Sequence, residues 1–406
     1  MHIWQWIFGI SCFLVFYNYA GYAILVLIIN RLEKRLKKTG QAPPAFYPSV
    51  SFIVAAYNEE DCIRPKILNT LAQDFPEDKI EFIFVTDGSS DNTPGIIRQF
   101  PAIRLLHNPE RGGKSAALDR AVREARMDIL IVSDANTILN KDAVKNIARH
   151  YQDPKVGGVA GEKKVISPTE GTDSVGASEG LYWKYESYLK RLDSDFYSVA
   201  GAAGELFSLR RNLYEPLPPN VILDDFVISL KVAQKGYAIR YEPEAYAMEL
   251  PSFSLKDEQT RKIRIAAGGF QSIGMLASLL AFWRHPRLTF LYVSHRVLRW
   301  TLSPLCLILA FVANGVLALR SPGPPALQAP GILFKALFIG QLLFYGLATL
   351  AALFPGIHQR SKLAKLAYYF AFMNISVIRG FFRFLGGRQA AAWEKAKRAQ
   401  QTLQSE

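Results

Sequence analysis

The run Val50-Ser-Phe-Ile-Val-Ala-Ala56, followed at once by Tyr57-Asn58-Glu59, is a short apolar stretch that ends in polar side chains. Four similar runs follow along the chain, at residues 80–86, 103–106, 129–133 and 156–160. Each is apolar nearly throughout, as in strands that helices cover on both faces, whereas half-exposed antiparallel strands alternate. Helical patterns lie between the runs, at residues 59–71, 115–125 and 141–150. Residues 45–255 are therefore predicted to form an α/β domain with a mostly parallel sheet.

Apolar residues also collect at both ends of the chain of 406 residues, and residues 3–29 contain no Asp, Glu, Lys or Arg. Because a bilayer core requires about 20 apolar residues of helix, residues 3–29, 300–319 and 336–354 are predicted to span a membrane. Residues 1–30 lack a basic start and a small-residue cleavage site, so we expect an uncleaved anchor. The carboxyl-terminal membrane region is predicted at 300–385. The shorter apolar stretch 366–378 is expected to lie in the interface, which gives three spans.

The distribution of positive charge predicts how the chain faces the membrane. Residues 31–38 carry five Lys or Arg against one Glu, and the positive-inside bias places them, and the domain that follows, in the cytoplasm. We therefore expect a multi-pass protein of the cell inner membrane. Residues 256–299 contain eight Lys or Arg and two acids, and a short helix with Phe282 and Trp283 is expected there. This pattern and the basic tail at 386–406 favour contact with anionic lipid rather than nucleic acid, despite the net charge of +13.

Polar residues cluster where three predicted strands end, which is the edge at which open α/β sheets bind ligands. Asp134 and Asn136 follow the fourth strand and offer hard oxygen ligands to Mg²⁺ or Mn²⁺, or simply form an Asx turn. Asp87 follows the second strand and either starts a turn or accepts hydrogen bonds from a nucleobase or ribose. Tyr57 is placed to stack on that base. The three cysteines are too scattered to form a disulfide framework or a thiolate metal site.

Two further segments carry candidate chemistry. The Gly112-Gly113-Lys114 segment lacks the first glycine of a Walker A loop, but it either holds phosphate through backbone N–H groups or forms a solvated loop. Asp224 and Asp225 precede an amphipathic run, so one of them caps a helix or Asp225 is a general base for an acceptor hydroxyl. The loop with Gly201, Gly204 and Glu205 would line the acceptor site. Tyr182 and Trp183 are interpreted as packing residues of a helix.

Taken in order and spacing, these motifs resemble the membrane-bound family 2 glycosyltransferases, the group that includes synthases of poly-N-acetylglucosamine, hyaluronan and cellulose. The motifs are Ala56-Tyr57-Asn58-Glu59-Glu60, Thr86-Asp87-Gly88-Ser89-Ser90-Asp91, Gly113-Lys114, Ser133-Asp134-Ala135-Asn136, Gly201 to Glu205 and Asp224-Asp225. The resemblance implies a GT-A (Rossmann-like) fold. It also implies inverting transfer from a nucleotide sugar, usually a UDP-sugar, to a glycan or lipid-linked acceptor in cell-surface or exopolysaccharide synthesis, with Mg²⁺ or Mn²⁺ as cofactor.

The resemblance also implies roles for single residues. The donor would be held by Tyr57, Asn58, Glu59, Asp87, Lys114, Asp134 and Arg264. The metal would be held by Asp134 and Asn136, the catalytic base would be Asp225, and the acceptor site would include Gly204, Glu205 and Asp224.

Two departures from the family pattern bear on the product and on the metal. Processive members carry Gln-Arg-x-Arg-Trp before the membrane, where this chain has Arg261-Lys262-Ile263-Arg264-Ile265. Arg264 is kept and the Gln and Trp are lost, which favours transfer of a single sugar over synthesis of a long chain. Asn136 stands where a second Asp is more usual, which predicts weaker metal binding. The alternative function is a non-catalytic membrane scaffold subunit with the same fold.

Overall fold

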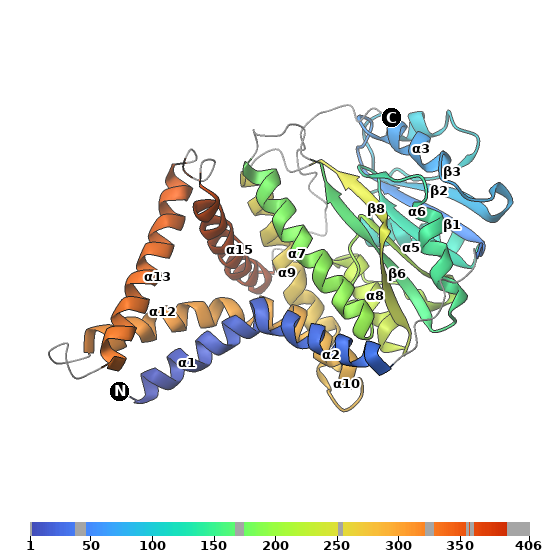
Figure 1. Cartoon of the computed structure of the whole chain (residues 1–406). Helices are drawn as coiled ribbons and strands as arrows, with labels where there is room; N and C mark the ends of the chain where they lie inside the picture. The colour runs from blue at the N-terminus through green and yellow to red at the C-terminus, as the bar shows by residue number, and fades with distance from the viewer. Residues whose placement is uncertain are drawn as a thin grey trace.

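The computed structural model describes residues 2–36, 46–166, 174–250, 255–320, 329–354, 357 and 361–387. An α/β domain lies at one side of the molecule, and long apolar helices extend from it on the other (Figure 1). The predicted basic cluster lies partly outside the described residues, at 37 and 38, and so does most of the predicted basic tail, at 388–406.

The α/β domain is built on one eight-stranded sheet with the order β3-β2-β1-β4-β7-β6-β8-β5. The strands are β1 (Val50–Ala56), β2 (Ile80–Asp87), β3 (Ile103–Asn108), β4 (Ile129–Asp134), β5 (Ile138–Leu139), β6 (Val156–Val165), β7 (Leu206–Arg210) and β8 (Ala238–Glu249). The strands β3, β2, β1 and β4 are parallel, and so is the pair β6 and β8. The strand β7 is antiparallel to β4 and β6, and β5 is antiparallel to β8. The predicted α/β class with a mostly parallel sheet is confirmed.

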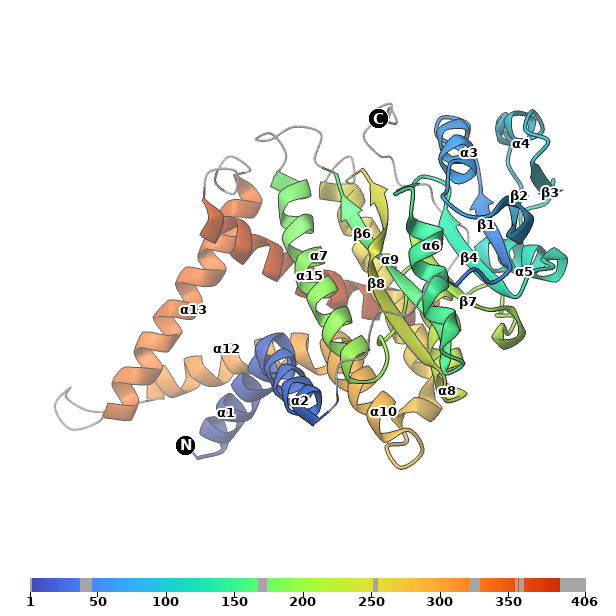
Figure 2. The same cartoon turned by 45° about the vertical axis from the view of Figure 1, so that its right-hand side comes forward.

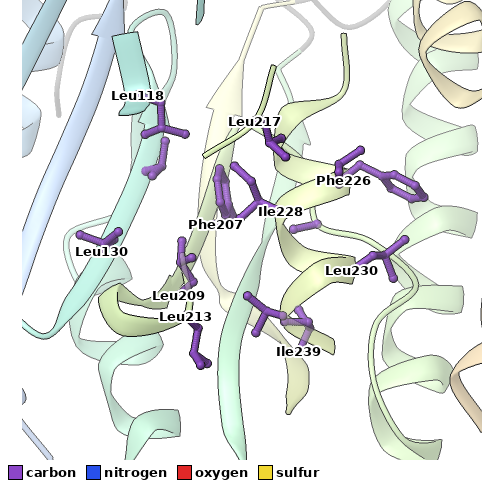
Figure 3. Packing of buried hydrophobic residues seen from close by; sticks show 14 of the residues in the cluster. Leu118, Leu130, Phe207, Leu209, Leu213, Leu217, Phe226, Ile228, Leu230 and Ile239 are labelled. Atoms are coloured by element: carbon purple, nitrogen blue, oxygen red, sulfur yellow. The ribbon is translucent and has the colours of Figure 1, made fainter. Parts of the chain in front are cut away.

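Helices cover both faces of the central strands, and neighbouring residues of β1 therefore enter different cores. Phe52 and Val54 pack with Ile67 of α3 (Ile63–Leu71), whereas Ile53 and Ala55 belong to the core on the other face. That second core lies between the sheet and the helices α5 (Lys114–Glu124) and α8 (Asp224–Gln234) (Figure 3). All residues of β1 are buried, as an apolar run predicts. The prediction of two covered faces is wrong for β3, an edge strand of partly buried side chains.

The register of the sheet determines the positions of the polar residues at the ends of β1, β2 and β4. Ala55 of β1 lies opposite Val85 of β2 on one side and Asp134 of β4 on the other. Asp87, two residues after Val85, therefore flanks the end of β1 from the side opposite Asp134. Tyr57 follows β1 between them, so three sequence motifs meet at one edge of the sheet.

The remaining helices complete the domain and connect it to the membrane region. They are α4 (Thr93–Ile97), α6 (Ala143–Ala148), α7 (Ser174–Phe196), α9 (Leu255–Met275), α10 (Pro286–Tyr292), α11 (Leu298–Trp300) and α15 (Lys362–Leu385), with the short 3₁₀ turns η2 (Glu77–Lys79), η3 (Arg149–Gln152), η4 (Arg211–Leu213) and η5 (Ala277–Leu280). Phe282 and Trp283 lie in an exposed turn between η5 and α10, so the short helix expected at these residues is a wrong prediction.

Three stretches of the described chain are long and apolar enough to cross a membrane, namely His2–Glu33, Leu302–Arg320 and Gly331–Leu353. They correspond to the three predicted spans. The first comprises α1 (His2–Phe16), a π-helical turn η1 (Tyr17–Gly21) and α2 (Tyr22–Leu36), and the others are α12 (Leu302–Arg320) and α13 (Ala329–Leu353). The start of α1, the end of α12 and the start of α13 all lie at the end farthest from the α/β domain (Figures 1 and 2). The stretch predicted at 366–378 is part of α15, which packs along α9.

The first span is bent at η1 and is tied there to the domain side of the molecule (Figure 1). Asn18 Nδ2 donates a hydrogen bond to Ser294 O at 3.1 Å, and Ser294 itself lies in a second π-helical turn, η6 (Val293–Val297). Tyr22 Oη donates to Asp193 Oδ1 of α7 at 2.5 Å, and the other oxygen of Asp193 lies 2.6 Å from Nδ1 of His295. The first span and helix α7 of the α/β domain therefore share one buried polar junction.

Candidate active site

A pocket opens at the carboxyl ends of β1 and β2 and brings together three of the predicted donor residues, Tyr57, Asp87 and Lys114. Its lining consists of Ala55, Ala56, Tyr57, Asp87, Arg111, Gly113, Lys114 and Ala117. The guanidinium carbon of Arg111 lies 3.9 Å from the centre of the Tyr57 ring. The pocket thus offers a flat aromatic and cationic surface next to a carboxylate.

Asp87 shapes one wall of this pocket by holding the loop that precedes α5. Its Oδ2 accepts hydrogen bonds from the backbone N–H groups of Gly112 at 2.9 Å and Gly113 at 2.7 Å. Both amides therefore donate to Asp87 in this structure, and neither is available to bind phosphate. Gly88 has φ +69°, and a Cβ there would lie 2.7 Å from Cβ of Arg111, so the close approach of the two loops requires glycine.

Asn58 and Glu59, which were also predicted to bind the donor, are not in the pocket lining. Asn58 bridges to the β2 loop, because its Oδ1 accepts from Ser90 N at 2.8 Å. Glu59 is buried, accepts from Sγ of Cys62 at 3.2 Å, and donates through its backbone N–H to Oγ1 of Thr93 at 2.8 Å. Both residues fasten the loops that carry Tyr57 and Asp87, and their contact with a donor stays a prediction.

Lys114 connects this pocket to a group of three carboxylates. Its Nζ donates to Oδ1 of Asp134 at 2.7 Å. Burial alone would lower the pKa of Lys114, but Asp134, Asp224 and Asp225 together hold it above its ordinary value. A Cβ on Gly204 would lie 3.1 Å from Nζ of Lys114 and 3.2 Å from Oδ2 of Asp225, so the bare glycine preserves the space between these groups. Carboxylates far apart in the sequence thus face one cleft.

Asp224 and Asp225 form the first turn of α8, but neither caps it. The residue at the N-cap is Leu223, and no side-chain capping bond is present there. Asp224 is only 5% exposed, and within the described residues its Oδ2 has no hydrogen-bond partner. Burial, together with the nearby charges of Asp224 and Glu205, raises the pKa of Asp225 to about 7 although Lys114 opposes this. A carboxyl group with this pKa is partly ionised near neutral pH.

Arg264 reaches the same carboxylates from α9, outside the sheet. Burial lowers the pKa of Arg264, and the charges of Asp224, Asp134 and Asp225 offset part of that effect. This predicted donor-binding residue therefore interacts electrostatically with the same carboxylates as Lys114, from α9 rather than from the sheet.

The predicted metal ligands Asp134 and Asn136 lie at the end of β4. Asn136 Nδ2 is 3.3 Å from Oε1 of Glu249, and because a carboxylate only accepts hydrogen bonds, Glu249 fixes the NH₂ end of this amide. Glu249 also pairs with Lys163, whose Nζ lies 2.6 Å from Oε1 of Glu205. Among the described residues, no group of three His, Cys, Asp or Glu side chains is placed to hold a metal. Asp134 and Asn136 still fit Mg²⁺ or Mn²⁺ if phosphate oxygens and water complete the coordination.

Comparison with known sequences agrees with this fold. Residues 51–217 match the family described as Glycosyl transferase family 2. The matched residues lie within the α/β domain, and the match agrees with the family resemblance of the motifs.

Among curated proteins, the chain is similar to poly-beta-1,6-N-acetyl-D-glucosamine synthases. It is 28% identical over 229 residues to one from Staphylococcus aureus (strain MSSA476), which is 55% of each chain. It is 24% identical over 290 residues to one from Staphylococcus epidermidis, which is 70% of this chain and 68% of that protein. The chain thus spans about half the length of the first of these relatives.

Among solved structures, a mannosyltransferase from Pyrobaculum calidifontis, solved with GDP-Man and Mn²⁺, has the same fold. The TM-score is 0.69 at 23% identity, and the match covers 94% of this chain and 99% of that one.

Sequence reasoning did not find the buried chain from Asn136 through Glu249 and Lys163 to Glu205, because it depends on how β6 and β8 pair. Lys163 lies opposite Ala247, two residues before Glu249, in that pairing. Sequence reasoning also did not find the contact of Tyr57 with Arg111, the residue before the Gly112-Gly113-Lys114 segment. The adjacency of Arg111 to two glycines was the available signal that it lies on a tight turn.

Proposed function

We propose that this chain is an inverting glycosyltransferase that moves a sugar from a UDP-sugar to a glycan acceptor at the cytoplasmic face of a membrane. The observation that carries the proposal is the convergence of Asp134, Asp224 and Asp225 around Lys114. They share this cleft with Gly204, and it adjoins the pocket of Tyr57 and Asp87. Such a site combines a nucleoside pocket, a cation for the diphosphate and a carboxylate base within one cleft.

In the proposed reaction, Asp225 removes the proton from an acceptor hydroxyl. The hydroxyl oxygen attacks the anomeric carbon from the face opposite the diphosphate, the bond to the diphosphate oxygen breaks, and UDP leaves. One displacement inverts the anomeric centre, so one base is sufficient and no covalent nucleophile is required. The raised pKa of Asp225, about 7, suits a carboxylate that must accept a proton.

The leaving diphosphate requires positive charge. Lys114 and Arg264 both interact with Asp134, Asp224 and Asp225, and they are the cations that would stabilise it. Mg²⁺ or Mn²⁺ held by Asp134 and Asn136 would supply further neutralisation of the diphosphate. Tyr57 would stack on the uracil, and Asp87 would accept a hydrogen bond from its imide.

The orientation in the membrane follows from the ends of the spans. The end of α2, which includes Arg31, lies toward the α/β domain, whereas the start of α1 lies at the far end (Figure 1). The positive-inside bias then supports a multi-pass inner-membrane protein with a cytoplasmic catalytic domain. Because the similar synthases act on N-acetyl-D-glucosamine units, UDP-N-acetylglucosamine is the donor that we would test first.

The test is UDP release by the purified full chain in detergent, with a panel of UDP-sugars and Mn²⁺. Asp225→Asn keeps the shape of the side chain and removes the base, so activity should fall at least about a hundredfold. Asp78→Asn changes an exposed carboxylate of η2 and is the matched control, which should retain activity. Full activity of Asp225→Asn would remove the base assignment. If the wild-type chain binds neither UDP nor Mn²⁺, the scaffold alternative replaces the proposal.

A further inference from the structure

The helix α7 lies between the sheet and the membrane helices, where it contacts β6 and β8 on one side and α2 and α15 on the other (Figure 2). Trp183, Ser187 and Lys190 are spaced so that they share one face of this helix. That face points toward β6, because Oγ of Ser187 donates to Glu162 at 2.6 Å. The Trp183 ring centre lies 4.8 Å from Nζ of Lys163, also on β6.

This face of α7 is close to the catalytic cleft. Lys163, which lies beside the indole, pairs with Glu205 at 2.6 Å. Glu205 follows Gly204, the residue whose missing side chain leaves space between Lys114 and Asp225. Trp183 is thus separated from the proposed base by one ion pair and one loop residue. Its location matches that of an acceptor, which must approach Asp225 from outside the nucleotide pocket.

Lys190 is the unusual residue of this face. It is only 2% exposed, and within the described residues no carboxylate, carbonyl or hydroxyl lies at hydrogen-bonding or ion-pairing distance from its Nζ. Its ammonium lies 5.8 Å from the Trp183 ring centre, and Glu162 and Glu205 act on it only at longer range. Buried lysines elsewhere are satisfied. For example, Lys66 donates to Oγ of Ser133 and to the backbone O and Oγ1 of Thr137.

Lys190 is nearly buried and has no protein acceptor among the described residues, so a ligand beside the indole can supply the acceptor. We propose that the face of α7 formed by Trp183 and Lys190 binds the terminal sugar of a glycan acceptor, and this inference rests on the proposed function. The apolar face of the sugar ring packs on the indole, a hydroxyl oxygen accepts a hydrogen bond from Lys190, and other hydroxyls donate to Glu162 or Glu205.

The charges around the indole favour a neutral sugar over a phosphate. Lys163 is matched by Glu205 and Glu249, and Lys262, whose Nζ is 5.7 Å from the Trp183 ring centre, pairs with Glu258 at 3.4 Å. Among the described residues around the indole, this leaves the ammonium of Lys190 for the ligand, which suits a hydroxyl. A phosphate site would present several uncompensated cations.

The test measures UDP release by the full chain in detergent with UDP-N-acetylglucosamine, Mn²⁺ and a β-1,6-linked N-acetylglucosamine pentasaccharide as the acceptor probe. Trp183→Leu and Lys190→Met should each raise the KM for the pentasaccharide about tenfold. Trp183→Phe keeps a ring and should raise it less. The matched controls are Tyr188→Leu and Lys184→Met, which should leave this KM as in the wild type. Tyr188 is 43% exposed and lies on the opposite face of α7, and Lys184 is also exposed.

A second measurement separates binding from a structural role. Lys190→Met replaces a nearly buried charge that has no protein acceptor among the described residues with an apolar side chain. It should therefore raise the thermal unfolding temperature while it weakens acceptor binding. If Lys190 were needed for folding, the same change would lower that temperature, and the proposal would be wrong. If Trp183→Leu misfolds and loses UDP binding, the pentasaccharide KM values of Trp183→Phe and Lys190→Met decide whether this face of α7 binds the acceptor.

The proposal is overturned if both single changes alter the pentasaccharide KM less than twofold, or if only a phosphorylated polyprenyl lipid in vesicles accepts the sugar. Its failure is distinct from failure of the proposed function. If only the acceptor site is wrong, the wild-type chain still binds UDP and releases it from the donor. If the proposed function is wrong, the wild-type chain does neither.

Discussion

Gly204→Ala adds a single methyl group at the centre of the proposed site. That Cβ would lie 3.1 Å from Nζ of Lys114 and 3.2 Å from Oδ2 of Asp225, closer than ordinary van der Waals contact. Both groups must therefore move by a few tenths of an ångström. The methyl group also occupies the space through which an acceptor hydroxyl reaches Asp225.

The expected result is a fall in kcat with little change in UDP affinity, because the residues that line the nucleoside pocket do not include Gly204. A 1 Å misplacement of reacting groups costs about a hundredfold, so the smaller shift plus the obstruction should cost about tenfold to a hundredfold. This loss corresponds to about 1.4 to 2.7 kcal/mol in activation free energy.

The assay is the UDP release described above, with UDP affinity measured separately by calorimetry. Gly274→Ala in α9 is the matched control, because its Cβ would meet nothing within 4 Å. A Gly204→Ala enzyme with kcat within twofold of the wild type, in an assay where Asp225→Asn is inactive, would refute the placement of the reaction between Lys114 and Asp225.

Three further predictions concern protons, metal and stability. The pKa of Asp225 is raised to about 7 and the base acts when it is ionised, so the reaction rate should rise as the pH increases through about 7. Well below that pH the rate should fall tenfold per pH unit. A rate that is constant from pH 5.5 to 8.5 would exclude Asp225 as the base. Glu249→Gln weakens the hydrogen bond that orients the Asn136 amide, so Mn²⁺ titrated in the presence of UDP should bind at least about tenfold more weakly. An unchanged Mn²⁺ affinity would show that Asn136 is not a metal ligand. Tyr22→Phe removes the hydrogen bond to Asp193 and should destabilise the protein by about 1.5 to 3 kcal/mol in thermal unfolding, whereas an unchanged unfolding temperature would show that this junction adds no stability.

The sequence predicted the strands that carry the site, because parallel strands buried on both faces are apolar without interruption. It did not predict β8, whose residues alternate with charged side chains and include Pro243. That proline lies where the pairing with β6 shifts register between Gly161 and Glu162, in a bulge that tolerates the missing N–H. Periodicity does not reveal such a strand.

Strand ends located Asp87 and Asp134 in advance, and the family pattern added Asp225. What joins them was not predictable from local sequence. Lys114 is next to a glycine pair in the chain, but only the fold brings its ammonium to Asp134 and near Asp225. The role of Trp183 was likewise hidden, because an aromatic residue on an amphipathic helix has the same pattern whether it packs in a core or meets a ligand.

The polar junction at the bend of the first span sets a limit on how a soluble fragment of this enzyme can be produced. Truncation before residue 46 would delete Tyr22 and Asn30, which bond to Asp193 and to the carbonyl of Leu192. It would open the side of α7 that carries Asp193 to solvent. An expression strategy that trims the amino-terminal helix on hydropathy alone would therefore undermine the same helix that carries Trp183 and Lys190, and detergent or nanodisc preparations of the intact chain are the sounder starting material.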